Sequence, residues 1–309
     1  MQQTISEKLI TNLLDTLSVS CIFCTSNVKF LLNKNNSQVT KALYTLVGTS
    51  EAIRLLNINN NFNNYIIKRF IHSNKSNKKW NQWLAGLIDG DGSFLLSKKG
   101  YASLEITMDI RDEHALQIIK NVYGGSIKLR AGANALRYRL HHKSGLLNLI
   151  NNVNGEIRNS NRLIQLNKIC YKYNINLIYP ENLIYDNGWL SGLFDSDGTV
   201  TINKTNTQLS ISISQKTSEL LKPLTDIYGG NIYIDRGSSQ SFKWYISKRE
   251  IILKLIDYFK CHPSRSAKNK RLHLIPKFYE LKDLKAHEAP ENSYLSKAFK
   301  FFIEKWDKI

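Results

Sequence analysis

The chain is poor in cysteine and in acidic residues, and it has no long apolar run. Its 309 residues include only four cysteines, which argues against a disulfide framework. Cys21 and Cys24 have the spacing of a redox or zinc motif, but no second Cys or His pair lies near them. No stretch of about 18 uncharged apolar residues occurs, so we expect no membrane span. The first residues also lack the charged and then apolar pattern of a secretory signal.

The deficit of acids leaves a strongly basic protein. Lys and Arg number 43 against 25 Asp and Glu, which gives a net charge of +18 and a pI near 9.6. An excess of this size favours phosphate binding through the release of counterions. On charge alone a passive basic surface explains the excess equally well, and an anionic membrane surface is a weaker reading. The composition therefore indicates a nucleic-acid partner.

A nine-residue string occurs twice and marks a duplication. It reads Leu84-Ala-Gly-Leu-Ile-Asp-Gly-Asp-Gly92 and Leu190-Ser-Gly-Leu-Phe-Asp-Ser-Asp-Gly198, so the copies start 106 positions apart. A second landmark, Tyr-Gly-Gly, begins at Tyr123 and again at Tyr228, 105 positions apart. Two landmarks at nearly the same offset indicate a duplicated domain.

Each copy of the string has the pattern of a helix that packs against a partner helix. Leu84, Leu87 and Ile88 form one apolar helical face, and the second copy repeats it. Small residues one turn apart let two helix backbones approach closely. We therefore expect the two motif helices to meet along their small residues, which are Gly86, Gly90, Gly192 and Ser196. Gly92 and Gly198 stand where each helix should end and a strand begin.

The acids at the helix ends predict a metal site. Asp91 and Asp197 are the last side chains of two adjacent helices, whose C-termini carry partial negative charge. Two carboxylates placed there need a cation, and oxygen ligands without Cys or His select Mg²⁺ over Zn²⁺. We expect the metal site to comprise Asp91 and Asp197 with the residues just before them, Gly90 and Ser196. Asp89 and Asp195 point to other sides of their helices and should make local polar contacts.

The motif has three other readings. A calcium loop needs Gly at its sixth position and Glu at its twelfth, which are Phe94 and Gly100 in the first copy. The second copy fails in the same way, with Val200 and Asn206. A plain helix C-cap with solvated acids, and a fold that has kept its shape but lost its chemistry, stay open.

The repeated string resembles the signature of the LAGLIDADG homing endonucleases, and the resemblance covers roughly residues 80–290. It implies an α+β fold of two tandem αββαββα repeats, whose antiparallel, saddle-shaped sheets straddle DNA. The domains are then an N-terminal extension and linker, partly helical at Ser37–Leu56, followed by the two repeats. Their ranges are 1–79, 80–179 and 180–309.

The hydrophobic periodicity places the elements of both repeats. Pro223 predicts a kink or a late start in its helix, and Ser247 to Glu250 has the spacing of a capping box. The expected strands are Ser93–Leu96, Ser103–Ile110, Ser126–Arg130, Arg137–His141, Thr199–Asn203, Gln208–Ser214, Asn231–Ile234 and Phe242–Ser247. The expected helices after each motif are Asp112–Tyr123, Ser144–Val153, Asn161–Tyr173, Thr217–Tyr228 and Ile251–Phe259.

The polar faces of these strands should contact the duplex, because side chains alternate between the faces of a strand. Arginine suits guanine edges, and Gln and Asn suit adenine. A solvated sheet face is the plainer reading of any single residue. The candidates are Lys128, Arg130, Arg137, Arg139, His141, Thr199, Thr201, Asn203, Gln208, Ser210, Ser212 and Lys243.

The family resemblance also suggests residues beside the metal. It places a basic residue in the loop before the last helix of each repeat, where this sequence has Arg158 in the first repeat and Arg265 or Lys268 in the second. It also places a polar, water-positioning residue at the end of a strand, and Gln215 fits. The counterpart of Gln215 by the 105 offset is Ile110, with Asp109 beside it, which puts symmetric water positioning in doubt.

These features together predict a monomeric, Mg²⁺-dependent, site-specific endonuclease acting in intron homing on a long asymmetric site in double-stranded DNA. The alternative is an RNA-binding maturase that assists splicing of its own group I intron; a DNA-binding regulator is a third reading. Intact Asp91 and Asp197 favour cleavage. Abundant Asn, Lys and Ile are typical of AT-rich coding sequence, and the family is common in organelle introns, so a mitochondrial matrix location is expected.

Overall fold

The computed structural model describes residues 77–235 and 240–309, and both repeats fall within one compact unit. Residues 1–76 of the expected extension lie outside the described residues. They include the expected helix at Ser37–Leu56 and the Cys21–Cys24 pair. Within the described residues, no helix has the length and apolar character needed to cross a membrane.

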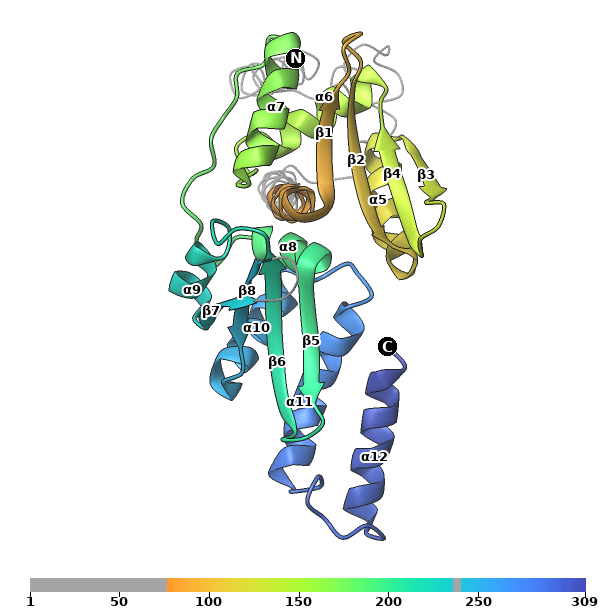
Figure 1. Ribbon diagram of the computed structural model, residues 1–309, viewed down its shortest axis with the longest axis vertical. Helices are drawn as coiled ribbons and strands as arrows, with labels where there is room; N and C mark the ends of the chain where they lie inside the picture. Colours follow the sequence, from red (N-terminus) through yellow and green to blue (C-terminus); the bar gives the residue numbers. More distant parts are fainter. Residues whose placement is uncertain (1–76, 236–239) are drawn as a thin grey trace, which may run out of the picture. The chain divides into compact units, whose positions relative to one another are not determined.

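The first repeat opens with a helix over residues 77–91, which buries Leu84, Leu87 and Ile88 completely. The chain then forms two hairpins, each followed by helix (Figure 1). The elements are β1 (Gly92–Leu96), β2 (Ala102–Asp109), the short 3-10 helix η1 (Ile110–Asp112), α5 (Glu113–Tyr123), β3 (Ser126–Leu129), β4 (Ala135–Leu140), α6 (Lys143–Val153) and α7 (Ser160–Lys172).

The second repeat follows the same order. Its elements are α8 (Trp189–Asp197), β5 (Gly198–Asn203), β6 (Gln208–Gln215), α9 (Lys222–Tyr228), β7 (Asn231–Asp235), β8 (Ser241–Ile246), α10 (Arg249–Cys261) and α11 (Asn269–Asp283). The predicted α+β fold with two αββαββα repeats is confirmed, and each repeat ends in one more helix, α7 or α11.

Each repeat builds a four-stranded antiparallel sheet, with strand order β1-β2-β4-β3 in the first and β5-β6-β8-β7 in the second. Strand β2 shows why one face is apolar: Leu104 and Ile106 are fully buried, while the alternating residues Ser103, Glu105 and Thr107 are half-exposed. Helices α5 and α6 pack on the apolar face of the first sheet. Each sheet is therefore left with one polar face.

The glycines that end the motif helices serve a different purpose from the one expected. Neither Gly92 nor Gly198 has a positive φ, and Gly198 is extended at φ −76°. A Cβ on Gly92 would lie 2.7 Å from Cα of Ile88, and one on Gly198 would lie 2.4 Å from the carbonyl oxygen of Phe194. Glycine is needed there because the strand leaves the helix at too close a distance for any side chain.

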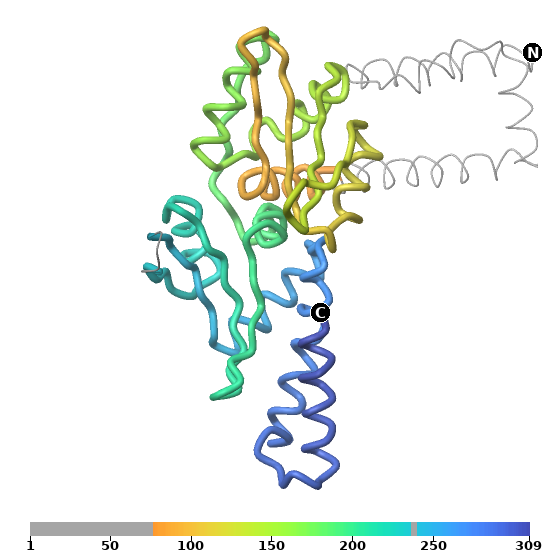
Figure 2. Tube along the Cα trace, turned by 45° about the vertical axis from the view of Figure 1, so that its right-hand side comes forward, coloured from red at the N-terminus to blue at the C-terminus, as the bar shows by residue number. Residues whose placement is uncertain are grey.

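Three local features of the second repeat can be compared with the sequence predictions. The late start predicted by Pro223 is confirmed, because α9 begins only at Lys222. The capping box is wrong, since the N-cap of α10 is Lys248 and has no side-chain cap bond. A further helix, α12 (Tyr294–Asp307), was not foreseen; it lies beside α11, with the Phe278 and Phe302 rings 6.1 Å apart (Figure 2).

Candidate active site and nucleic-acid surface

The two motif helices pack backbone against backbone. A Cβ built on Gly86 would lie 2.0 Å from the carbonyl oxygen of Trp189, and one on Gly192 would lie 1.8 Å from that of Trp83. A Cβ on Gly90 would lie 1.9 Å from Oγ of Ser196. The structure thus brings all four small residues of the motifs into one seam, and three of them have no room for a larger side chain.

The first acid of each motif accepts a hydrogen bond from the tryptophan that directly precedes the motif string of the other repeat. Trp189 Nε1 donates to Asp89 Oδ2, and Trp83 Nε1 donates to Asp195 Oδ2, both over 2.7 Å. Asp89 also accepts from the backbone N–H groups of Arg158 and Asn159. Asp195 accepts in the same way from the loop before α11. These buried carboxylates therefore fasten both loops to the helix pair, which is the local polar role expected of them.

The second acids of the motifs, Asp91 and Asp197, lie close together. A Cβ on Gly90 would lie 2.5 Å from Asp197 Oδ2. Burial, and after it the charge of Asp197, raises the pKa of Asp91 to about 7. Burial likewise raises the pKa of Asp197, while hydrogen bonds from Ser196 and Gln215 oppose the rise. Two half-buried carboxylates therefore repel each other at this point.

The donor set at this point fits a hard divalent cation. Among the described residues, no side chain donates a hydrogen bond to the Asp91 carboxylate, and no group of three His, Cys, Asp or Glu side chains is arranged to hold an ion. Two carboxylates that leave other positions to water and phosphate oxygens are typical of Mg²⁺ sites. The carbonyl oxygens of Gly90 and Ser196 already accept from Arg162 and Lys268, although each keeps a second lone pair.

Lys268 and Arg162 supply positive charge beside the two acids. Lys268 Nζ donates to three carbonyl oxygens in the last turn of α8, those of Phe194, Asp195 and Ser196, at 3.2, 2.8 and 2.7 Å. Arg162 Nη2 reaches the carbonyl oxygen of Gly90 at 3.4 Å. The sequence analysis does not predict Arg162 as a site residue. It precedes Lys268 by 106 positions, which is the offset of the motif strings and could have identified it.

The side chains of Arg158 and Arg265 face elsewhere. The guanidinium of Arg158 lies 5.7 Å from the ring centroid of Trp189 and donates to the carbonyl oxygen of Glu181. That of Arg265 lies 4.5 Å from the ring of Trp83. Both side chains contact the tryptophans of the helix pair, and their expected role at the scissile phosphates stays a prediction.

Gln215 lies at the acid pair. Its Nε2 donates to Asp197 Oδ2 over 2.8 Å, from the end of β6. The strand register corrects its expected counterpart, because Gly92 pairs with Ile106 and Gly198 pairs with Ile213. Met108 therefore takes the position of Gln215 in the first repeat, and it is buried. Asp109 instead pairs with Arg111.

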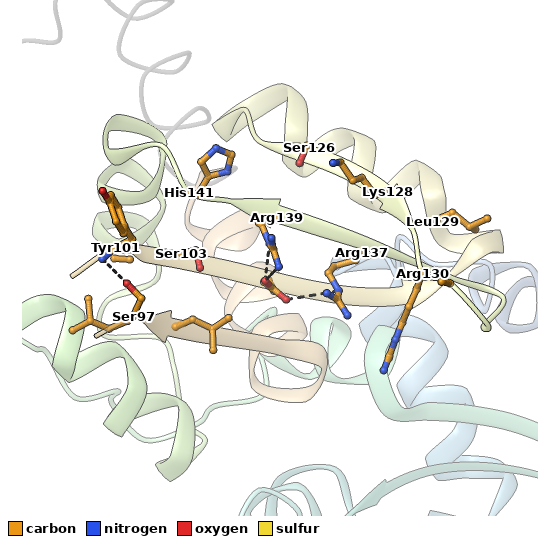
Figure 3. A pocket seen from close by; sticks show the side chains of 15 residues that line it. Ser97, Tyr101, Ser103, Ser126, Lys128, Leu129, Arg130, Arg137, Arg139 and His141 are labelled. Atoms are coloured by element: carbon orange, nitrogen blue, oxygen red, sulfur yellow. Dashed lines mark hydrogen bonds and ion pairs between the residues drawn. The ribbon is translucent and has the colours of Figure 1, made fainter. Parts of the chain in front are cut away.

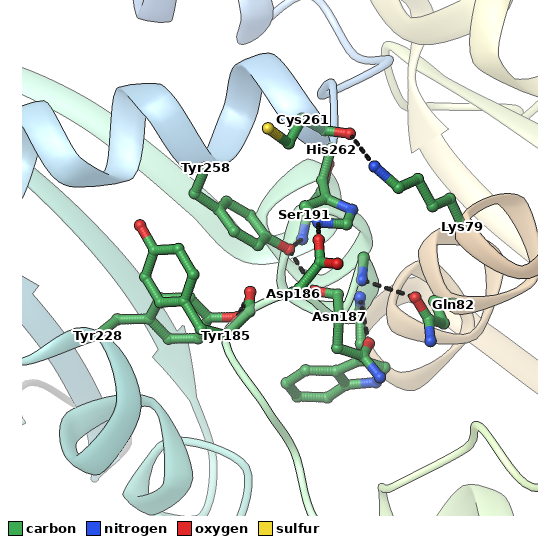
Figure 4. A network of polar contacts seen from close by, with 12 residues as sticks. Lys79, Gln82, Tyr185, Asp186, Asn187, Ser191, Tyr228, Tyr258, Cys261 and His262 are labelled. Carbon is green, nitrogen blue, oxygen red and sulfur yellow. Dashed lines mark hydrogen bonds and ion pairs between the residues drawn. The ribbon is translucent and has the colours of Figure 1, made fainter. Parts of the chain in front are cut away.

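A polar network fixes the start of α8 (Figure 4). Tyr258 Oη donates to the carbonyl oxygen of Asn187 over 2.7 Å and accepts from the Ser191 N–H. The Gly188 N–H donates to Gln82 Oε1 of the first motif helix, over 2.9 Å. The second motif helix is thereby held at its start as well as along the seam.

The polar face of the first sheet forms a basic hollow of about 940 Å³ (Figure 3). Five of the predicted DNA-contacting residues line it, namely Lys128, Arg130, Arg137, Arg139 and His141. Glu105, which the sequence interpretation passed over, lies among them. It is the single acid of this lining, and it forms ion pairs with Arg137 and Arg139.

The polar face of the second sheet is nearly uncharged. Thr199, Thr201, Asn203 and Gln208 are exposed on it, and Lys243 is half-exposed. Ser210 and Ser212 lie on the same face but are only 6% and 4% exposed, because neighbouring side chains cover them. Period-two alternation identified their face correctly, yet direct base contact by these two serines would need the neighbours to move.

Comparison with known proteins agrees with this architecture. The sequence model of the LAGLIDADG endonuclease family matches residues 84–173 and 190–279. The intron-encoded RNA maturase bI4 of Saccharomyces cerevisiae is 44% identical over 94% of this chain and 50% of its own length. The probable intron-encoded endonuclease aI2 of Debaryomyces hansenii is 39% identical over 77% of this chain and 39% of its own length. The chain thus spans half or less of these two relatives.

Solved structures share the fold at low sequence identity. The I-LtrWI homing endonuclease bound to target DNA superposes with a TM-score of 0.56 at 17% identity, covering 75% of this chain and 98% of that one. I-GzeII in complex with its DNA target gives 0.53 at 19% identity, covering 72% and 96%. With the motif matched in both halves, the chain belongs to the LAGLIDADG endonuclease family.

Proposed function

We propose that this chain is a site-specific endonuclease for double-stranded DNA. The observation that carries the proposal is the convergence of Asp91 and Asp197 at the ends of two helices that glycine packs into contact. Mutual repulsion of two carboxylates is an unfavourable arrangement for a purely structural site, and it becomes favourable when a cation binds between them. The family's named activity, DNA cleavage, requires such a site.

Within this proposal, Asp91 and Asp197 hold Mg²⁺, with the free lone pairs of the Gly90 and Ser196 carbonyls available to it. When bound, the ion would polarise the scissile phosphates and lower the pKa of the attacking water. Lys268 and Arg162 offset the negative charge that the phosphates add.

Gln215 orients a water at one of the two acids. Its amide nitrogen is fixed on Asp197 Oδ2, which leaves its side-chain oxygen to accept a hydrogen bond from that water. Met108 at the matching place of the first repeat offers no such acceptor. The two strands of the duplex are therefore attacked from unequal surroundings.

The two sheets hold the duplex on either side of the acids, with one protein chain per DNA. The first sheet offers arginines and the second offers hydroxyl and amide groups, so the two half-sites differ and the target is asymmetric. A symmetric dimer on a palindrome would need identical halves. Light scattering of the complex should give one chain per duplex, and an obligate dimer would contradict this stoichiometry.

Cleavage is tested by incubating the protein with DNA that spans its intron-insertion site, in Mg²⁺ or in EDTA. The proposal expects double-strand cutting at one position in Mg²⁺ and binding without cutting in EDTA. We also propose a location in the mitochondrial matrix, which the intron-encoded relatives and the Asn-, Lys- and Ile-rich composition support and which fractionation of organelles would check.

A second candidate function is assistance in splicing a group I intron. The specific observation is the 44% identity to a relative named as an RNA maturase, over nearly the whole chain. Splicing of the precursor RNA, with and without the protein, tests this activity directly. An Asp91→Asn variant that still supports splicing but does not cut DNA would show that the two activities are separate.

A further inference from the structure

Glu105 is out of place on a surface that binds phosphates. It occupies the middle of β2, facing the hollow of the first sheet, and its side chain is 17% exposed. Fourteen other residues line that hollow, and none of them is acidic. A carboxylate in such a surface repels the DNA backbone, so it weakens the electrostatic attraction that supplies non-specific affinity.

The carboxylate is engaged by two arginines, one at each oxygen. Arg139 lies directly opposite Glu105 in the strand register and donates from Nε to Oε1 over 2.6 Å, with Nη2 also in contact. Nε of Arg137 lies 3.7 Å from Oε2. Figure 3 shows the two arginines side by side on β4, joined by dashed lines to the carboxylate between them.

This geometry uses one edge of the Arg139 guanidinium and leaves the other free. The fork has five N–H donors in a rigid plane, and Glu105 takes the Nε edge. The side chain of Arg139 is still 51% exposed and that of Arg137 is 37% exposed. The outer Nη groups are therefore available to a ligand while the plane is held by the sheet.

The fold itself does not require this arrangement. In the second sheet the register places Ser212 opposite Tyr245, at the position that Glu105 and Arg139 occupy in the first. That sheet is completed without an acid or an arginine at this place. The Glu105 cluster is thus a property of the first half alone, and it belongs to the surface rather than to the core.

We propose that Glu105 is a specificity-determining residue that positions Arg139 and Arg137 to read guanine in one half of the DNA site. Arginine reads guanine through two parallel hydrogen bonds to O6 and N7, which demands a fixed guanidinium plane. Glu105 fixes that plane before DNA arrives, so less rotamer entropy is lost on binding. The cost is a weaker attraction to DNA of any sequence. This proposal rests on the proposed endonuclease function.

The test is selection of preferred sites from a duplex library, for the wild type, Glu105→Gln and Arg139→Lys. Glu105→Gln keeps the shape of the side chain but removes its charge, while Arg139→Lys keeps charge but removes the fork. The control is Glu113→Gln, which removes the same charge from α5, away from the hollow.

The wild type should enrich one or two G·C pairs within one half-site. Glu105→Gln and Arg139→Lys should each lower that enrichment about tenfold, in the range of one bidentate contact. Glu105→Gln should also bind non-cognate duplex more tightly, and Glu113→Gln should keep the wild-type preference. Thermal melting of each variant confirms that the protein remains folded.

Two results would overturn the proposal in distinguishable ways. An unchanged base preference in Glu105→Gln, with or without a lower melting temperature, would reduce the cluster to an ordinary surface ion pair. A wild type that enriches no sequence at all would refute the endonuclease function, and the assignment of Glu105 with it.

Discussion

Lys268 Nζ donates to the carbonyl oxygen of Ser196 over 2.7 Å, directly before the acid Asp197. The last carbonyls of a helix carry partial negative charge, and Lys268 also binds those of Asp195 and Phe194, the latter of which accepts from the Gly198 N–H as well. Arg162 makes a single contact of 3.4 Å at the end of the other motif helix. The C-terminal ends of the two motif helices are nearly identical in sequence, but their carbonyl oxygens are hydrogen-bonded to different extents.

We predict that Lys268→Met slows cleavage more than Arg162→Met does. Removing Lys268 takes a hydrogen bond from the Asp195 and Ser196 carbonyls beside Asp197 and deletes the nearer positive charge, so a loss of about 100-fold is expected, against about tenfold for Arg162. Single-turnover cleavage of a supercoiled plasmid measures the cleavage rate of each strand, because the nicked product (one strand cut) and the linear product (both strands cut) separate on a gel. Nicked plasmid should accumulate with Lys268→Met, and equal loss in both variants would contradict the unequal sites.

The acid pair gives a second prediction. Asp91→Asn or Asp197→Asn should abolish double-strand cutting while DNA binding stays nearly unchanged, because the lost charge is negative and binding depends on cations. Asp257→Asn, on the exposed surface of α10, is the matched control. Gel shifts and cleavage assays on the same target separate the two effects, and wild-type cutting in either site variant would remove Asp91 and Asp197 from the mechanism.

The duplication is what made much of this site predictable from sequence. The 106 offset located Gly86 and Gly192, and helical spacing placed Asp91 and Asp197 at the ends of their helices. The same offset applied to Lys268 would have found Arg162. Spacing did not show how Arg158 is oriented: its backbone N–H binds Asp89, while its guanidinium lies over the Trp189 ring. Such a difference depends on rotamers and neighbours, which spacing does not encode.

The sheets show a second limit of sequence reasoning. Alternation placed Arg137 and Arg139 on the polar face, but strand register decides which residues lie opposite them. Register brought Glu105 to Arg139, and it replaced the expected Ile110 by Met108 as the counterpart of Gln215. Helix α12 lies beyond the second landmark, so no repeat was there to reveal it.

The raised pKa of Asp91 predicts how stability depends on pH in the absence of divalent ions. In the folded protein Asp91 stays protonated up to about pH 7, whereas in the unfolded chain it ionises near 3.8. Between these values the folded state binds more protons, so the free energy of unfolding decreases as pH rises through this window. Burial shifts the pKa of Asp89 in the same direction.

Melting in EDTA at about pH 5.5 and pH 8 checks this prediction. The wild type should melt lower at pH 8, and Asp91→Asn should show a smaller drop, since it loses the contribution of Asp91 and keeps those of other buried acids such as Asp89 and Asp197. Adding Mg²⁺ at pH 8 should raise the melting temperature of the wild type and leave Asp91→Asn nearly unchanged. An identical pH response in the two proteins would show that Asp91 is not the titrating group.

The helix seam gives the last prediction, which concerns Gly86. A Cβ there would lie 2.0 Å from a backbone oxygen of α8, so even Gly86→Ala must push the helices apart. Overpacking of this kind typically costs about 1–3 kcal/mol, and Gly86→Leu should cost more. The displacement also separates Asp91 from Asp197, so cleavage should fall further than stability does.

Ala298→Leu serves as the control, because it adds bulk to the exposed side of α12, where a larger helix-forming residue is nearly neutral. Gly86→Ala is the decisive variant: alanine favours a helix intrinsically by about 1 kcal/mol over glycine, so any loss of stability must come from the seam. If Gly86→Ala melted above the wild type and cut DNA at full rate, close contact of the two helices would not be what brings the acids together.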